Sequence, residues 1–230
     1  MTAKASPTKR RLHGERVQRL RASHTYRYVL AMIIVSFAFT ATAPDTAWAR
    51  SVLVFIQSAT LVVALWTSGL TKYARASLVL VGFSIGVAVA LALEPSDILT
   101  GIVGIFDLFL ALGVAAIVAF GIIDQGEVNA QSVTGAICVY LLLGLGFTFL
   151  YGAAAALGNG PFFSQGTDGT LAIRLYFSYI TLATVGYGDY TPAGDFGHMM
   201  AVIEALTGQL YLVTVVALLV SRVGLPRSSD

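Results

Sequence analysis

Six apolar runs dominate the sequence, and each is close to the ~20 residues that an α-helix needs to cross the hydrocarbon core of a bilayer. Because 57% of the 230 residues are apolar and only 11% are charged, these runs cannot all be packed inside a water-soluble domain. We therefore expect an all-α membrane protein with six transmembrane helices. The predicted spans are residues 28–42, 51–69, 76–93, 98–123, 133–157 and 197–221.

Basic residues are concentrated at the amino end of the chain. Eight of its fourteen Lys and Arg residues precede the first apolar run, and cytoplasmic segments of membrane proteins carry such an excess. We therefore expect a cell-membrane protein in which residues 1–27 are a basic cytoplasmic segment and, after six crossings, residues 223–230 are a short cytoplasmic tail. Acidic residues fall mainly in the loops that this topology places outside, at Asp45, Glu94, Asp97, Asp168, Asp189 and Asp195.

The basic segment leaves two questions open. It is either a disordered tail that only sets the topology or a short interfacial helix that binds anionic lipids. The basic leader, the first apolar run and Ala47-Trp48-Ala49 also resemble a signal peptide with its cleavage site. A retained first helix is the favoured interpretation, because a leader of 27 residues before the apolar run is unusually long.

A shorter apolar stretch lies between the fifth and sixth runs. Residues 171–183 read LAIRLYFSYITLA, which is too short to cross a bilayer, so we expect a short re-entrant helix there. It leads directly into Thr184-Val185-Gly186-Tyr187-Gly188-Asp189. Glycine permits backbone angles that let successive carbonyls aim at one axis, and threonine adds a hydroxyl oxygen. The carboxyl end of the preceding helix favours a cation at the same place.

A non-helical strand at membrane depth is tolerated only where it is buried in protein or lines water. The hexapeptide is therefore expected to line an ion pathway, although an isolated Gly-x-Gly can also be an ordinary turn. On this hexapeptide and the helix before it, residues 133–222 resemble the outer helix, pore loop and inner helix of tetrameric P-loop potassium channels. We call residues 133–222 the pore unit.

The resemblance implies a role for each residue of the hexapeptide. Potassium, as permeant ion rather than cofactor, would bind the Thr184 hydroxyl and the backbone carbonyls of Thr184, Val185, Gly186 and Tyr187. Support of this filter is implied for Gly188, Asp189 and Thr181. Tyr176 precedes Asp189 by thirteen residues, where the family often has an aromatic residue, more frequently tryptophan, that hydrogen-bonds the aspartate. Because one loop cannot surround an ion, we expect a homotetramer.

Two residues of the last span are further candidates. Gly208 stands where many members of the family bend the inner helix to open, and close helix packing is an equally favoured interpretation. Glu204 lies one turn earlier. We expect it to brace the filter by accepting a hydrogen bond from Thr181 or Tyr179, with pH-dependent gating as the open alternative.

Residues 28–123 are predicted to be a domain of four transmembrane helices, the front helices. In related channels the fourth such helix often carries several arginines that sense voltage, whereas here no Lys or Arg occurs between Ala76 and Ile173. We therefore expect weak or no voltage sensing. The sole charge of the fourth span is Asp107. It is predicted either to hydrogen-bond Gln57, Ser58 or Ser84 or to couple the front helices to the pore unit through its protonation.

The sequence thus predicts a passive potassium-selective channel. A weakly selective cation channel, and a non-conducting sensor or subunit that keeps the fold, remain as alternatives. An enzyme is not expected, because no catalytic set, metal-ligand spacing or phosphate loop is present. No cofactor and no nucleic-acid partner are expected either.

Overall fold

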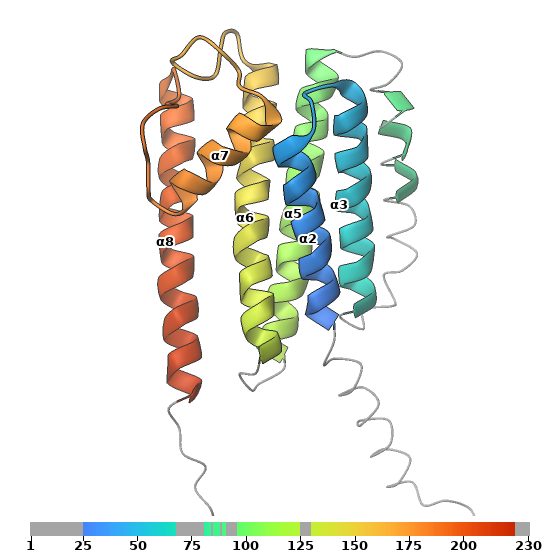
Figure 1. Ribbon diagram of the computed structural model, residues 1–230, viewed down its shortest axis with the longest axis vertical. Helices are drawn as coiled ribbons and strands as arrows, with labels where there is room; N and C mark the ends of the chain where they lie inside the picture. The colour runs from blue at the N-terminus through green and yellow to red at the C-terminus, as the bar shows by residue number, and fades with distance from the viewer. Residues whose placement is uncertain are drawn as a thin grey trace, which may run out of the picture.

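The computed structural model describes residues 25–67, 81–83, 85–87, 89–90, 96–124 and 130–223. Helices make up almost all of the regular structure in this part of the chain (Figure 1), beside two isolated β-bridges of Phe163. The fold is all-α, as expected. The helices are α2 (Thr25–Thr42), α3 (Ala47–Thr67), α5 (Asp97–Asp124), α6 (Ala130–Leu157), α7 (Leu171–Leu182) and α8 (Asp195–Val223).

Four of the described helices are long and apolar enough to span a membrane: α3, α5, α6 and α8. The first predicted span is also helical, but its apolar part, Tyr26–Thr42, is shorter than the other four. Most of the third predicted span, residues 76–93, lies outside the described residues, and its described residues 81–83, 85–87 and 89–90 are helical. Four spans are therefore established by length and composition, and the count of six stays a prediction.

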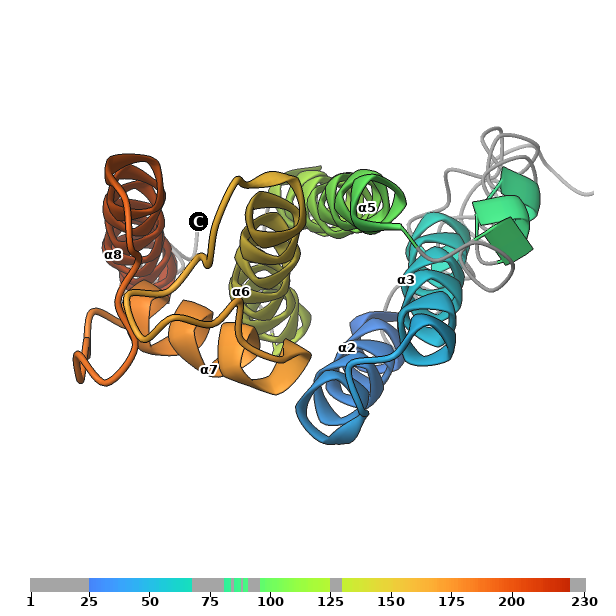
Figure 2. The ribbon, with the colours of Figure 1, turned by 90° about the horizontal axis from the view of Figure 1, so that it is seen from above.

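The long helices run side by side, and α7 crosses them obliquely near one end (Figure 1). Seen along the bundle, α7 lies over one side of α6, with α8 at one of its ends and α2 at the other (Figure 2). The connections on both sides of α7, the loop between α2 and α3, and the start of α5 share the upper end in Figure 1. The start of α2 and the end of α8 lie at the lower end.

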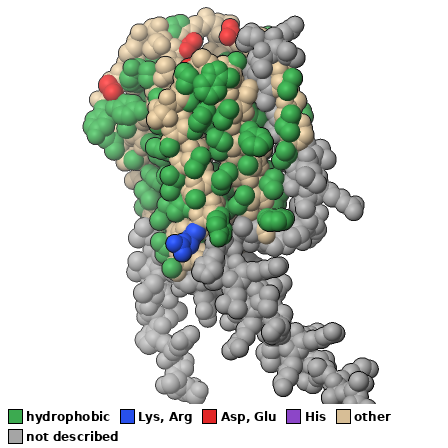
Figure 3. Space-filling view, turned by 45° about the vertical axis from the view of Figure 1, so that its right-hand side comes forward, with side chains coloured by type: hydrophobic (Ala, Val, Ile, Leu, Met, Phe, Trp, Pro, Cys, Tyr) green, Lys and Arg blue, Asp and Glu red, His purple; other side chains and the backbone are tan. Residues whose placement is uncertain are grey.

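The surface follows the same division. In the view of Figure 3, apolar side chains cover the length of the bundle, acidic side chains lie at its upper end, and a basic side chain lies at its lower end. This distribution is typical of a protein whose middle faces hydrocarbon.

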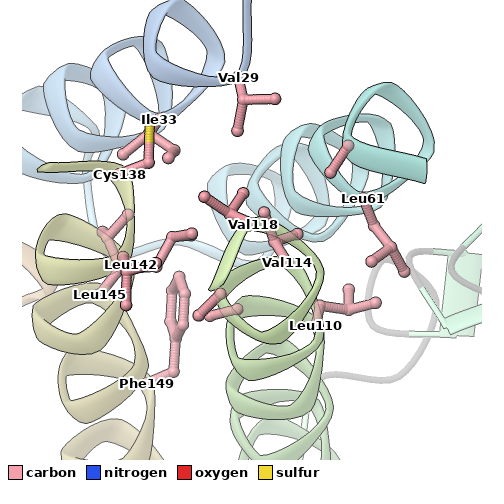
Figure 4. Packing of buried hydrophobic residues seen from close by; sticks show 14 of the residues in the cluster. Val29, Ile33, Leu61, Leu110, Val114, Val118, Cys138, Leu142, Leu145 and Phe149 are labelled. Atoms are coloured by element: carbon pink, nitrogen blue, oxygen red, sulfur yellow. The ribbon is translucent and has the colours of Figure 1, made fainter. Parts of the chain in front are cut away.

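The main core lies where α2, α3, α5 and α6 meet (Figure 4). Val29 and Ile33 of α2 face Cys138 and Leu142 of α6, and Val114 of α5 completes this layer. The front helices and α6, the outer helix of the pore unit, therefore share one hydrophobic core.

Glycines allow α5 and α6 to approach closely. A Cβ at Gly104 would lie 3.0 Å from the Phe149 carbonyl oxygen and 3.2 Å from the Ala153 Cβ. The first neighbour is a backbone atom and the second is bonded directly to the backbone, so neither can move aside by a side-chain rotation. Such contacts between small residues are the usual basis of helix packing in membranes.

We predict that Gly104→Ala lowers the free energy of unfolding by about 1 kcal/mol, because overpacking outweighs the better helix propensity of alanine. Gly113→Ala is the matched control on the same helix, since its new methyl would meet only the Leu61 side chain at 3.6 Å. Thermal unfolding in detergent measures both. Equal midpoints for the two variants would contradict the packing argument.

Candidate functional site

The short helix α7 is defined at both ends by local hydrogen bonds. Thr170 caps its start, and its side-chain oxygen accepts from the Ile173 amide at 3.3 Å. The Ala183 amide donates to the Tyr179 carbonyl at its end. The structure thus places a helix of 12 residues where the sequence predicts one, with its carboxyl end directly before Thr184.

After α7 the backbone φ angle alternates in sign from residue to residue. Thr184, Gly186 and Gly188 have φ angles of 56°, 54° and 78°. Thr184 is the only non-glycine residue in the described part of the chain with a positive φ, a conformation that costs a side-chain-bearing residue about 1 kcal/mol or more. A strained residue retained at this position indicates a functional constraint.

In this segment, backbone amides make hydrogen bonds within the chain, whereas the carbonyls do not. The amides of Val185 and Gly186 both donate to the Ile180 carbonyl, at 2.8 and 3.1 Å. Alternating backbone handedness gathers successive N–H groups on one side and leaves the carbonyls for the other. Within the described residues, the four carbonyls from Thr184 to Tyr187 accept no hydrogen bond. They form a row of free acceptors.

The outer end of the segment is fixed by Tyr176 of α7. Its hydroxyl donates to the Asp189 Oδ2 at 2.8 Å, and its ring stacks on Tyr187 with centroids 6.4 Å apart. The hydrogen bond to Asp189 raises the pKa of Tyr176 to about 12, so the phenol keeps its proton at neutral pH. Tyrosine therefore makes the contact that the family resemblance implies for this position.

The loop before α7 is more ordered than its polar sequence indicates. The Ser164 amide donates to the Thr191 carbonyl at 2.8 Å, and the Ala193 amide donates to the Phe162 carbonyl at 2.8 Å. Gln165 Nε2 donates to the Asp189 carbonyl at 2.8 Å. The loop is thereby fastened to the chain that leaves the hexapeptide. Sequence reasoning missed these contacts, and the paired Phe162 and Phe163 are the signal that a buried anchor interrupts the polar loop.

Glu204 lies behind α7 and is fully buried. Tyr151 of α6 donates to its Oε2, and the Ser178 hydroxyl of α7 lies at 2.5 Å from its Oε1. The predicted partners were wrong, because Tyr179 donates instead to the Leu141 carbonyl and, in the described residues, the hydrogen bonds of Glu204 are with Tyr151 and Ser178. Ser178 is one helical turn before the predicted Thr181 and shares its face.

The number of available protons determines how this cluster is bonded. The Ser178 hydroxyl has one proton but lies within hydrogen-bond distance of two acceptors, Glu204 Oε1 and the Gly144 carbonyl at 2.7 Å. A protonated Glu204 allows one more hydrogen bond than an ionised one, because Glu204 then donates to Ser178 while Ser178 donates to the Gly144 carbonyl. The cluster therefore joins α6, α7 and α8 most completely with a neutral Glu204.

Asp107 does not make its predicted bonds. It is only 4% exposed, and its Oδ1 has no hydrogen-bond partner in the described residues. The amide atoms of Gln57 and the hydroxyl of Ser58 are likewise without partners there, and Ser84 lies outside the described residues. Asp107 instead lines a cavity together with Arg174 of α7.

An ion pair that sequence reasoning missed links the front helices to α7. Asp45, in the loop between α2 and α3, accepts from Arg50 at 2.8 Å and from Arg174 at 3.3 Å. Burial lowers the pKa of Arg174, and Asp45 opposes that effect. The available signal was that Asp45, Arg50 and Arg174 carry opposite charges and are all predicted on the same side of the membrane.

Gly208 lies where α8 meets the end of α7. A Cβ there would overlap the carbonyl oxygen of Leu182 and would lie 2.9 Å from its Cδ1. Close packing therefore requires this glycine, whereas its role as a hinge stays a prediction.

The comparisons with known proteins concern this same region. Residues 136–224 match a family model described as an ion channel. They include most of α6 and all of α7 and α8. This part of the chain is therefore similar to the pore region of P-loop potassium channels. With its four apolar helices, the chain is a membrane-spanning protein.

Two curated relatives share part of the sequence. The inward rectifier potassium channel Kirbac3.1 of Paramagnetospirillum magnetotacticum is 33% identical over 70 residues, which are 30% of this chain and 24% of the relative. Protein LctB of Bacillus caldotenax is 35% identical over 83 residues, which are 34% of this chain and 61% of the relative. The chain thus spans about a quarter and about three fifths of these relatives. No solved structure matches it.

The Glu204 cluster leads to a prediction. Glu204→Gln should keep stability near that of the parent, because the amide can donate to Ser178 and accept from Tyr151. Glu204→Ala should lower the free energy of unfolding by about 3 kcal/mol, since it leaves a cavity and unpaired hydroxyls. Thermal unfolding in detergent distinguishes them. Equal damage by both substitutions would mean that an ionised carboxylate is required.

We also predict that Gly208→Ala lowers the free energy of unfolding by about 2 kcal/mol, because the new methyl group must displace the backbone at the end of α7. Gly160→Ala adds the same methyl where nothing lies within 4 Å and should change stability little. The measurement is again the unfolding midpoint. A stable Gly208→Ala protein would show that α8 and α7 can separate at this point without cost.

Proposed function

We propose that the protein is a potassium-selective channel of the cell membrane that conducts K⁺ passively through a filter formed by residues 184–187. The observation that carries this proposal is the row of four consecutive carbonyls without hydrogen-bond partners, placed at the carboxyl end of α7. Carbonyl oxygens replace the hydration shell of K⁺ in filters of this kind. The match to an ion channel family and to a potassium channel supports the same conclusion.

The working form that we propose is a homotetramer. One row of carbonyls reaches an ion from one side only, so a ring requires several copies around an axis. α8 carries exposed apolar residues at alternating intervals of three and four, which is the spacing of a helix-to-helix interface. These residues are Phe196, Met199, Ile203, Leu206, Leu210 and Val213.

The proposed orientation places both ends of the chain in the cytoplasm and the filter near the outer face. Acidic residues at the upper end of the bundle, including Asp97, Asp168 and Asp195, would concentrate cations at the mouth. α5 contains no Lys or Arg, so the field across the membrane has no positive charge to move in this helix. Gating by voltage through the front helices is therefore not part of the proposal.

The alternative of a weakly selective channel requires a filter that is destabilised by Tyr176 or Glu204. The hydrogen bond from Tyr176 to Asp189 at 2.8 Å, and the hydrogen bonds of Glu204 with Tyr151 and Ser178, argue against it. No observation favours a non-conducting subunit. Flux measurements distinguish it from a channel.

The test is ion flux through the purified full chain in liposomes. We expect K⁺ efflux at least about a hundredfold faster than Na⁺ efflux, and block by Ba²⁺, because a filter of carbonyls suits the larger dehydrated cation. Equal K⁺ and Na⁺ flux would indicate a nonselective channel, and absence of flux would indicate a non-conducting protein. Either result contradicts the proposal.

A matched pair of variants locates the pathway. Gly186 and Gly166 have φ angles of 54° and 76°, and neither has an atom within 4 Å of an added Cβ. Alanine therefore imposes a similar backbone strain at both, but only Gly186 belongs to the carbonyl row. Gly186→Ala should abolish selective K⁺ flux, whereas Gly166→Ala should retain it. Identical flux in both variants would place the pathway elsewhere.

A further inference from the structure

A cavity of about 240 Å³ lies between the front helices and the pore unit. Residues of α3, α5, α6 and α7 line it, and its lining includes Asp97 at the start of α5 and Asp107 farther along the same helix. Its apolar walls include Leu53, Val103 and Phe149. The proposed filter is not part of this cavity, so the cavity calls for an explanation of its own.

Asp107 is the acidic residue of this cavity that has a buried, unpartnered oxygen in the described residues. Its side chain is almost fully buried, and its Oδ1 has no hydrogen-bond partner among the described residues. A buried carboxylate without a partner costs several kcal/mol. A buried group without a partner calls for an explanation, and a ligand or ion that completes it is one such explanation.

Both arginines of the cavity already make hydrogen bonds, and in the described residues the Arg174 Nε is the guanidinium atom left without a partner. Arg50 donates to Asp45 and to the Thr100 hydroxyl at 2.8 Å. Arg174 donates to Asp45 and, at 2.7 Å, to the Gly169 carbonyl. Neither guanidinium forms an ion pair with Asp107.

The charge of the cavity favours a cation. Its lining contains four acidic residues (Asp45, Asp97, Asp107 and Asp168) and two arginines, which leaves an excess of two negative charges when all are ionised. The described residues contain no group of three His, Cys, Asp or Glu side chains that could hold a metal ion. An organic cation fits better, because its N–H groups can bond one carboxylate while its carbon atoms contact the apolar walls.

We propose that this cavity binds a primary amine in its ammonium form, with the ammonium group on Asp107 and the alkyl part against Val103 and Phe149. A volume of 240 Å³ holds about eight water molecules at ~30 Å³ each, which is enough for a small alkylamine. The ammonium group belongs either to a free amine or to an ethanolamine lipid headgroup. The experiments below measure amine binding and not ion flux, so their failure would leave the proposed channel function unaffected.

The experiment measures thermal unfolding of the purified full chain in detergent with n-butylammonium chloride. We expect a saturable rise in the unfolding midpoint, because a ligand that binds only the folded state stabilises it. Neutral n-butanol lacks the charge, and tetramethylammonium lacks the N–H donors. If either raises the midpoint as n-butylammonium does, or if n-butylammonium gives no saturable rise, the proposal is wrong.

Variants test whether Asp107 is the binding group. Asp107→Asn should weaken the apparent affinity for n-butylammonium at least tenfold, whereas Asp195→Asn, the same change at an exposed site outside the cavity, should leave it unchanged. Ala156→Leu keeps the carboxylate and fills part of the cavity, so it should also weaken binding, and it serves if Asp107→Asn does not fold. Unchanged affinity in either cavity variant overturns the assignment.

Lipid composition identifies the source of the amine. In nanodiscs of phosphatidylethanolamine, a headgroup ligand would compete with n-butylammonium and raise its half-saturating concentration above that in phosphatidylcholine. Equal half-saturating concentrations would assign the site to a free amine. Both outcomes support the ammonium site, and binding in neither lipid contradicts it.

Discussion

The organisation of the pore unit depends on how one short backbone segment satisfies its hydrogen bonds. Unpaired backbone amides are costly in hydrocarbon and in protein interiors, and the backbone amides of Val185 and Gly186 both donate to the Ile180 carbonyl. The carbonyls of the same segment are left free. This asymmetry gives a row of free oxygen atoms that can bind dehydrated cations or water.

Three contacts hold that segment in place from different sides. Tyr176 fixes its outer end through Asp189. The Glu204 cluster ties α7 to α6 and α8, and Gly208 lets α8 reach the backbone at the end of α7. Because these contacts join α7 to Asp189, to α6 and to α8, the position of the carbonyls depends on the whole pore unit. The ion pair from Asp45 to Arg174 extends the connection to the front helices.

The features that follow from local pattern could be predicted from the sequence. Apolar runs gave four of the spans closely, and residues 171–183 gave α7 to within one residue. The contact of Tyr176 with Asp189 was implied by family spacing. Side-chain partners across helices were not predictable, because they depend on helix rotation. Glu204 therefore bonds Ser178 and Tyr151 instead of Thr181 or Tyr179, and Asp107 faces a cavity instead of Gln57.

The central claim is that four copies of residues 184–187 surround a line of K⁺ ions. Anomalous diffraction from crystals of the full chain grown with Tl⁺, a heavy-atom substitute for K⁺, tests it most directly. The account predicts a fourfold axis with a column of anomalous peaks between the carbonyls of Thr184, Val185, Gly186 and Tyr187. An assembly without fourfold symmetry around this segment, or peaks absent from the axis, would contradict it.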